Sequence, residues 1–529
     1  MIIVQNGQLV SPSGLTRADL ALDGGRIVAI EPHIEPGEGD TVHDAAGCYV
    51  FPGFIDGHTH LDMESGSLVT ADDFTTGTRA AVCGGTTTIV DFATQDKGGN
   101  LNDALDAWHK KADGRCSCNY AFHMAITDWN DQVKAELPEM FRRGVTSFKA
   151  YMAYDALKVN DAELLEILQS LKPFGGILGV HCENGLLVNE LQARQKELGH
   201  FGPDAHPASR PAEVEAEAVN RLCYLGKLAD TPVHVVHLST ELGLEEVRAA
   251  RKKGVKVYAE TCPQYLTMDE SRYKAPGFEG AKYVMSPPLR TPADVQALRK
   301  AVAAGEIDTI ATDHCSYNFK GQKDLGIEDF TRIPNGGPGI EHRPMVVYTS
   351  MVQPGELAVT DFCRLLAENP AKLFGMYPRK GVLAVGSDAD VTVWDPEAHR
   401  GPPAAKCGLY PLRGLCRNRH AQSSIRGRRA GSRIRPAYRP CGRHLREALK
   451  GASPCIPCKR CGTPHRQKHQ TAGVSAGGYA ADQREERLRR GHLRHLHRPG
   501  GRQEDQGLRV HHREAERQAH HHCGRPDRA

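Results

Sequence analysis

Eight short apolar segments recur through residues 53–314, and the helix-length stretches between most of them constrain the fold more than any other feature. The segments are GFIDGH, TTTIVDF, NYAFHMAI, VTSFKAYM, GILGVHC, TPVHVVHL, VKVYAET and IDTIATDH. The intervening stretches include DAELLEILQSLK and PAEVEAEAVNRLCYLGKL, which have the composition of amphipathic helices. Eight strands alternating with helices over about 260 residues is typical of a (β/α)8 barrel. We therefore predict an α/β fold with a TIM-like barrel.

Strand-like segments also flank the barrel region on both sides. Residues 1–52 contain MIIVQNG, ADLALDG, GRIVAIE and AAGCYVFPG, and LALDGGRIVAI has the turn chemistry of a β-hairpin. GVLAVGSDADVTVWDP returns to this pattern after the barrel. We expect the two parts to pair in one small β-sandwich domain. The predicted limits are 1–52 for its first part, 53–374 for the barrel and 375–400 for its second part.

Polar side chains lie at the ends of several predicted strands. His58 and His60 end the first segment, and residues i and i+2 of a strand point to the same side. The later segments end in, or contain, Lys149, His181, His237 and Asp313. Active sites of (β/α)8 barrels form at the C-terminal ends of the strands, so these side chains are expected to meet. Histidine, carboxylate and lysine in one place predict a metal site.

Each of these residues also has a structural interpretation. An isolated H-x-H is a weak signal, His237 is compatible with a hydrogen-bonded core histidine, and Lys149 with a side chain that reaches the surface. However, a lysine inside an apolar strand is costly unless its charge is changed or paired. Because five strands deliver a ligand-type residue at the same end, the metal interpretation is favoured.

The strand-end residues and seven longer segments resemble the dihydropyrimidinase and hydantoinase family of the amidohydrolase superfamily. The segments are DDFTTGTRAAVCGGTTTIVDF, FKAYMAY, ETCPQYL, MSPPLR, TDHC, IPNGGPGIEHR and NPAKLFGMYPRKG, and the resemblance covers residues 1–396. It implies hydrolytic ring opening of 5,6-dihydropyrimidines and 5-monosubstituted hydantoins to N-carbamoyl amino acids, a reaction of pyrimidine catabolism. It also implies a homotetramer.

The same resemblance implies a binuclear zinc centre. His58, His60 and Asp313 would hold the more buried ion, and the remaining histidine ligands would be His181 and His237. Lys149, carboxylated on its amine, would bridge the two Zn²⁺ ions together with a hydroxide. Carboxylation makes chemical sense of a buried lysine, because it creates an anionic oxygen ligand suited to zinc.

Roles in catalysis and substrate binding follow from the resemblance as well. Asp313 would act as general base and then as general acid, and Tyr154 would donate to the developing oxyanion. Ser286 and Asn335 would bind the imide and ureide edge of the ring, largely through backbone groups.

Asp62 in HTHLDM bears on the choice of substrate. Dihydroorotases resemble this pattern but carry an arginine at this position, which holds the substrate carboxylate. A carboxylate-bearing ring is therefore disfavoured here, and its charge would meet Asp62. Two alternatives stay open: an allantoinase-like hydrolase of a cyclic ureide, and a non-catalytic interaction protein of the dihydropyrimidinase-like type. Relatives of the second kind lack the metal ligands, whereas this chain keeps all six.

The resemblance ends near residue 400. Residues 401–529 contain 29 lysines and arginines against 9 acidic residues, whereas the first 400 residues have a net charge of −17. Read one base later, a back-translation of 408–422 can spell DYTPYEGFAETGMPK, which looks like the family's continuation. We interpret 401–529 as a frameshifted, mostly disordered tail. CIPCKRC and the basic charge then carry no zinc or nucleic-acid function, and no nucleic-acid partner is expected.

The N-terminus and the cysteines predict a cytoplasmic protein. MIIVQNGQLVSPSG lacks the basic and apolar regions of a signal peptide, and no apolar run is long enough for a membrane span. The cysteines before residue 401 lie mostly in apolar segments and are expected to be reduced. Neither a membrane partner nor a disulfide framework is expected.

Overall fold

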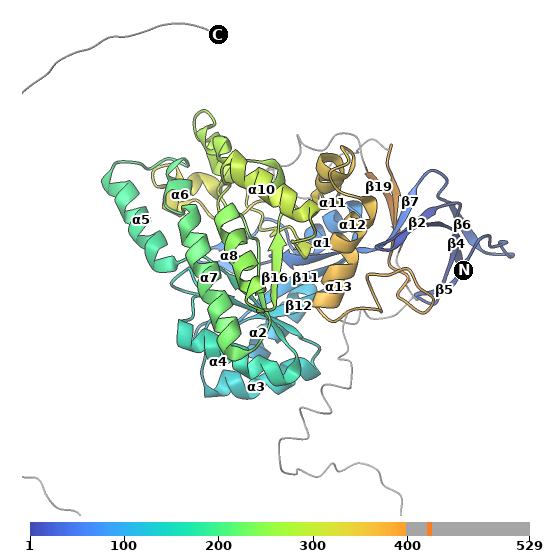
Figure 1. The fold of residues 1–529 in the computed structure, drawn as a ribbon, viewed down its shortest axis with the longest axis horizontal. Coiled ribbons are helices and arrows are strands. Elements are labelled where there is room, and N and C mark those ends of the chain that lie inside the picture. The colour runs from blue at the N-terminus through green and yellow to red at the C-terminus, as the bar shows by residue number, and fades with distance from the viewer. Residues whose placement is uncertain (398–419, 426–529) are drawn as a thin grey trace, which may run out of the picture. The chain divides into compact units, whose positions relative to one another are not determined.

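The computed structural model describes residues 1–397 and 420–425 of the chain. The described part consists of a barrel surrounded by helices and a smaller region of β-sheets, which lie side by side in Figure 1. The tail predicted for 401–529 lies outside the described residues, apart from the short strand His420–Ile425.

The barrel is one sheet of eight parallel strands. In sheet order they are β17 (Thr309–Ile310), β16 (Val257–Thr261), β15 (Val233–Val235), β14 (Ile177–His181), β13 (Ser147–Tyr151), β12 (Asn119–Ala125), β11 (Thr86–Thr94) and β8 (Phe54–Thr59). The sheet closes where the His60 N–H donates to the carbonyl of His314 at 2.8 Å. Each strand coincides with one of the eight apolar segments, so the predicted barrel is confirmed.

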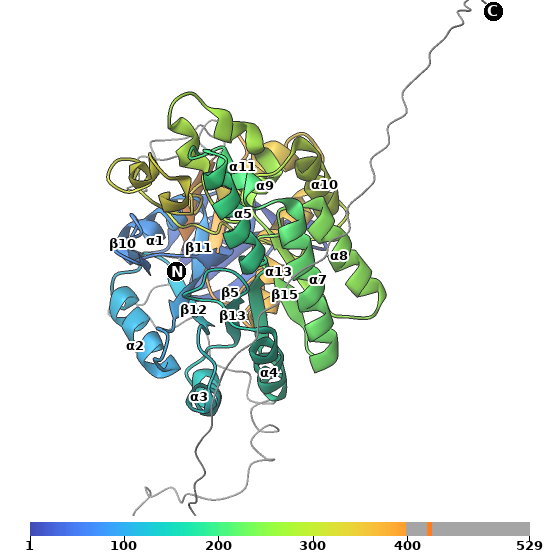
Figure 2. The ribbon, with the colours of Figure 1, turned by 90° about the vertical axis from the view of Figure 1, so that its left-hand side faces the viewer.

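Helices follow most of the barrel strands and cover the sheet, as Figure 2 shows. They are α1 (Phe74–Cys83), α2 (Leu101–Ala112), α3 (Asp131–Arg142), α4 (Asp161–Leu171), α5 (Gly185–Glu197), α6 (Ala205–Ala208), α7 (Ala212–Ala229), α8 (Glu241–Lys252), α9 (Pro263–Thr267), α10 (Pro292–Ala303), α11 (Arg343–Val347), α12 (Val359–Cys363) and α13 (Asn369–Leu373). Asn100, Asn130 and Asn160 cap α2, α3 and α4 by accepting backbone N–H groups of the first turn. The barrel strands are buried over nearly their whole length, which makes the ionisable residues on them informative.

The small region contains two sheets that share a core. One sheet has the order β5 (Arg26–Glu31), β4 (Asp19–Asp23), β1 (Ile2–Gln5) and β6 (Thr41–Asp44). The other has the order β19 (His420–Ile425), β18 (Val391–Asp395), β7 (Tyr49–Pro52), β2 (Gln8–Ser11) and β3 (Gly14–Arg17). Buried residues of both sheets pack together, among them Val4, Leu20, Val50 and Val391.

Strands from the two flanks of the barrel therefore form one β-sandwich, as the fold class predicted. The expected hairpin LALDGGRIVAI is confirmed, because β4 and β5 pair antiparallel. Strands β2, β3 and β6 were not singled out from the sequence. The domain limits and the frameshift interpretation stay predictions. Strand β19, which lies in the segment expected to be tail, pairs antiparallel with β18.

Candidate active site

A cavity of about 540 Å³ lies at the C-terminal ends of the barrel strands. Its lining includes all nine residues singled out from the sequence: His58, His60, Lys149, Tyr154, His181, His237, Ser286, Asp313 and Asn335. Helix α5 closes part of the cavity with Val188, Asn189 and Gln192, and it lies in front of the barrel strands in Figure 2. The structure therefore brings the nine residues together, while their individual roles stay predictions.

His58, His60 and Asp313 form the tightest cluster in the cavity. The Nε2 atoms of His58 and His60 each lie 3.2 Å from Oδ1 of Asp313. One nitrogen or oxygen of each residue lies within 4.8 Å of the others, the spacing of groups able to share a metal ion. Burial opposes ionisation of Asp313, but the two facing imidazoles outweigh it and hold its pKa well below the usual range.

His181 and His237 form a second pair beside this cluster. Nδ1 of His181 lies 3.0 Å from Nε2 of His237, and the rings of His58 and His237 are 5.5 Å apart. The other ring nitrogen of His181 lies 2.8 Å from the carboxylate of Glu183, which also accepts from Arg210. Glu183 therefore holds His181 with one nitrogen turned toward the second histidine.

Lys149 lies in the middle of β13 and is 1% exposed. Burial lowers the pKa of its amine to about 8, while Asp313 and Glu260 act in the opposite direction. A lowered pKa enriches the neutral amine, which is the form that adds to CO₂. The structure thus rejects the alternative in which Lys149 reaches the surface.

Three cavity residues adopt a left-handed backbone conformation that side chains rarely take. The φ angles are 69° at Tyr154, 40° at His237 and 52° at Asp313. Such strain persists only where the surroundings impose it, and it concentrates at functional sites. Burial also raises the pKa of the Tyr154 phenol to about 12, so the hydroxyl keeps its proton and is a hydrogen-bond donor near neutral pH.

Ser286 and Asn335 lie on two neighbouring loops of the cavity wall. Around Ser286, the carbonyl of Met285 accepts from His206 at 2.8 Å and that of Pro287 accepts from Tyr265 at 2.7 Å. Within residues 1–397, the backbone N–H and C=O of Ser286 and the N–H of Asn335 form no backbone hydrogen bond. These groups are thus available to a ligand in the cavity.

Two acidic residues near the metal ligands were missed in the sequence. Glu260 in β16 lies 2.8 Å from Nδ1 of His58, and Glu183 contacts His181 as described above. Both are fully buried. Glu260 lies within the segment VKVYAET, so the reasoning applied to Lys149 was sufficient to find it, whereas Glu183 directly follows GILGVHC.

Asp62 does not face the cavity, which corrects part of the substrate argument. Its carboxylate accepts from the backbone of Phe74 at 3.1 Å and from Arg115 at 3.3 Å. The expected repulsion between Asp62 and a substrate carboxylate is therefore wrong. The other part of the argument, that no arginine occupies this position, is unaffected.

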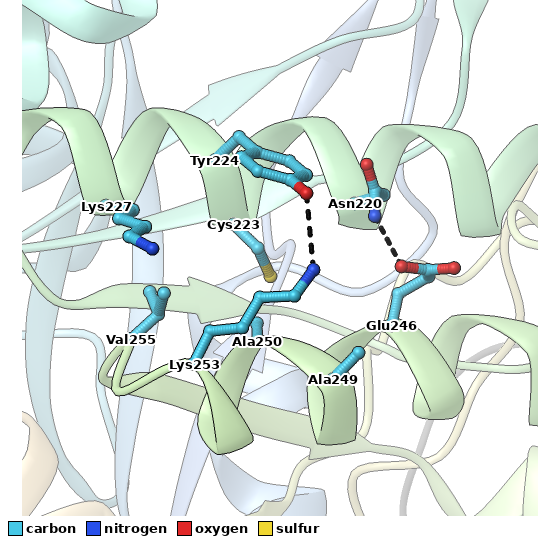
Figure 3. Close-up of a pocket in the computed structure, with 9 residues that line it drawn as sticks. All are labelled: Asn220, Cys223, Tyr224, Lys227, Glu246, Ala249, Ala250, Lys253 and Val255. Atoms are coloured by element: carbon cyan, nitrogen blue, oxygen red, sulfur yellow. Dashed lines mark hydrogen bonds between the residues drawn. The ribbon is translucent and has the colours of Figure 1, made fainter.

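A separate hollow lies between α7 and α8, where Tyr224 accepts a hydrogen bond from Lys253 at 3.2 Å (Figure 3). It has space of only about 10 Å³ and none of the predicted site residues lines it. A cavity of this size accommodates about one water molecule. The strand-end cavity is therefore the candidate active site.

The profile of the amidohydrolase family matches residues 49–425, well over half of the chain. The chain belongs to the amidohydrolase family. It is 44% identical over 400 residues to D-hydantoinase from Geobacillus stearothermophilus, an alignment that covers 75% of this chain and 85% of the relative. The resemblance to the dihydropyrimidinase and hydantoinase family is thereby confirmed.

Solved structures agree with this assignment. Dihydropyrimidinase from Brevibacillus agri NCHU1002 superposes with a TM-score of 0.79 at 40% identity, covering 82% of this chain and 95% of that one. L-hydantoinase (dihydropyrimidinase) from Arthrobacter aurescens gives 0.71 at 28% identity, covering 83% and 96%. No helix in the described part of the chain is long and apolar enough to cross a membrane.

Proposed function

We propose that this protein hydrolyses cyclic amides, opening 5,6-dihydropyrimidines and 5-monosubstituted hydantoins to N-carbamoyl amino acids with the help of two zinc ions. The observation that carries the proposal is the convergence of four histidines, a buried lysine and an aspartate on one 540 Å³ cavity. Relatives named for hydantoinase and dihydropyrimidinase activity support the substrate class.

The donor set of the cavity fits zinc. Imidazole nitrogen and carboxylate oxygen are ordinary zinc ligands, and Nδ1 of His237 is buried without a hydrogen-bond partner. His58, His60 and Asp313 would hold one ion, His181 and His237 the other, and a carboxylated Lys149 would lie between them. Zinc supplies a lowered pKa for water and polarises the carbonyl that is attacked.

In this proposal, Asp313 acts first as the general base and then as the general acid. Its carboxylate lies against the two imidazoles of the strand-end cluster, where it is placed to accept a proton from the attacking water. The same carboxyl then delivers the proton to the ring nitrogen as the C–N bond breaks. Tyr154 donates its hydroxyl proton in a hydrogen bond to the oxygen that gains negative charge.

Ser286 and Asn335 orient the ring. Their free backbone groups match the alternating N–H and C=O groups of a cyclic imide or ureide. A neutral ring edge needs no charged partner, whereas a carboxylate substituent does. The tetrameric assembly expected from the family stays a prediction.

A comparison of four rings tests the proposal. Dihydrouracil and a neutral 5-substituted hydantoin should be opened by the zinc-loaded protein, and mass spectrometry should detect the N-carbamoyl products. Dihydroorotate should be a poor substrate, since no arginine occupies the position of Asp62 to pair its carboxylate. Turnover restricted to dihydroorotate or allantoin would overturn the substrate assignment.

Two further outcomes separate the remaining alternatives. No turnover of any ring at full zinc occupancy would favour a non-catalytic interaction protein. The assay should include the chain as written and a version with the reading frame restored after residue 400. If only the restored version is active, the defect lies in the tail of the chain as written, and the assignment of the active site stands.

A further inference from the structure

Lys323 is a fully buried lysine that takes no part in the cavity. It begins the short helix Lys323–Gly326, is 0% exposed and is absent from the cavity lining. Its Nζ donates to the carbonyl of Val284 at 2.6 Å and to the carbonyl of Gly336 at 2.7 Å. Burying an ammonium group is costly unless it is hydrogen-bonded, so these two bonds help to hold the lysine in place.

The two carbonyls belong to the loops that carry Ser286 and Asn335. Val284 precedes Ser286 by two residues, and Gly336 follows Asn335 directly. A third hydrogen bond joins the loops, from the Gly336 N–H to the Val284 carbonyl at 3.1 Å. Lys323 therefore bridges the backbones of the two loops that line the same side of the cavity.

The backbone of Gly336 is tightly constrained where the loops meet. Its φ is +142°, and a Cβ atom there would lie 2.3 Å from the carbonyl oxygen of Cys315. The segment before Lys323 is also fixed, because Gln322 donates to the carbonyl of Val69 at 2.7 Å. Val69 ends β10 (Leu68–Val69), which pairs with β9 (Glu64–Ser65) in a hairpin whose Ser65 and Leu68 line the cavity.

We infer that Lys323 is a positioning residue for ring recognition: its ammonium group sets the spacing of the two loops so that Ser286 and Asn335 engage one ring together. The inference rests on the proposed function, which gives these two residues the ring edge. It assigns Lys323 no part in metal binding or proton transfer. Loss of the ammonium should therefore weaken substrate binding and leave the metal centre unchanged.

Lys323→Met tests this, because it keeps the length of the side chain and removes the charge and the donors. KM for dihydrouracil should rise about ten- to hundredfold, the scale of one or two hydrogen bonds to a charged group. The value of kcat should change less than about threefold, since the reacting groups are untouched. Zinc content should equal that of the wild type, and amide hydrogen exchange should accelerate in 284–287 and 335–337.

Lys320→Met is the matched control, because Lys320 lies in the same segment and is exposed. It should leave KM and loop exchange unchanged. Lys323→Ala with added propylammonium should regain much of the wild-type KM, while 1-propanol, which has the same shape without the charge, should not. The wild type with each additive controls for effects of the amine on zinc.

The outcomes distinguish this inference from the proposed function. Wild-type protein that opens no cyclic amide refutes the function, whereas loop exchange in Lys323→Met still tests the bridge. Unchanged KM and unchanged exchange would overturn the inference. Parallel loss of kcat and zinc at constant KM would overturn it too, because Lys323 would then support folding in general. If Lys323→Met does not fold, Lys323→Arg keeps the charge and must retain a KM near that of the wild type.

Discussion

Of the nine cavity residues singled out from the sequence, six lie on barrel strands or just beyond their ends, whereas three lie on loops. The strand wall comprises His58, His60, Lys149, His181, His237 and Asp313, and the loop wall comprises Tyr154, Ser286 and Asn335. The histidines and the aspartate of the strand wall face one another at close distances, such as 3.2 Å between His60 and Asp313 and 3.0 Å between His181 and His237. The loop wall instead presents a phenol and backbone groups, and residues outside the cavity hold its shape.

Because the two walls differ in this way, substitutions in them should impair the enzyme differently. The parallel strands hold the side chains of the strand wall in a fixed arrangement. Substitutions in the strand wall should therefore change metal binding and the catalytic rate. Substitutions of the loop wall and its support should act on ring binding or on the oxyanion while the metal content stays constant. Measuring zinc, kcat and KM together on each variant therefore tests the comparison itself.

Lys149→Ala should have the largest effect. Removing the buried amine leaves four histidines and Asp313 without the central ligand, and turnover should fall to background with loss of the binuclear site. Zinc analysis and activity are measured together, and short carboxylic acids should restore part of both. Lys256→Ala, a change of an exposed lysine, is the control. Full zinc content with wild-type turnover would refute the role of Lys149.

Asp313→Asn should come second. The amide cannot carry the proton, so kcat should fall by on the order of 10²–10⁴, the usual scale of general acid–base catalysis. The variant should fold and keep part of its zinc. His314 is a poor substitute base, because its Nδ1 accepts from the backbone of Gly339 at 3.0 Å and its ring is fully buried. An unimpaired Asp313→Asn would place the base elsewhere.

Tyr154→Phe should be the strongest loop-wall variant. Removing one donor to a developing oxyanion lowers kcat by about 10²–10³. Because the phenol is not a zinc ligand in this scheme, zinc content should equal that of the wild type. Tyr224→Phe, in the hollow between α7 and α8, is the matched control and should change nothing. Loss of zinc in Tyr154→Phe would break the separation between the two walls.

The strand wall could be predicted from the sequence because barrel strands are buried on both faces. In a buried strand, an ionisable residue such as Lys149 or His181 needs a partner or a function, and the periodicity of strands shows which residues share a side. All eight barrel strands were found in this way. Glu260 obeys the same rule, because it is a fully buried carboxylate within β16.

The loop wall could not be derived from residue patterns. Ser286 and Asn335 were named through family resemblance, and nothing in the sequence indicates that Lys323 bonds to carbonyls 39 and 13 residues away. The orientation of Asp62 was misjudged for the same reason, since its partner Arg115 is distant in the chain. Long-range backbone contacts of loops have no periodic signal.

Glu260→Gln should have the smallest effect and gives the sharpest test of the comparison. Glu260 accepts from Nδ1 of His58 at 2.8 Å, which leaves Nε2 of the imidazole facing Asp313. A glutamine keeps an acceptor oxygen but loses the charge, so zinc affinity should fall by about 10- to 100-fold, as for other partners of metal-bound histidines.

At saturating zinc, KM of Glu260→Gln should match the wild type, the opposite of the result expected for Lys323→Met. Glu270→Gln, a change outside the cavity, controls for the loss of a carboxylate. Zinc titration with a competing chelator measures the affinity, and ring kinetics measure KM. A raised KM with unchanged zinc affinity would mean that a carboxylate behind the strand wall acts on the ring, and the division between the two walls would then be wrong.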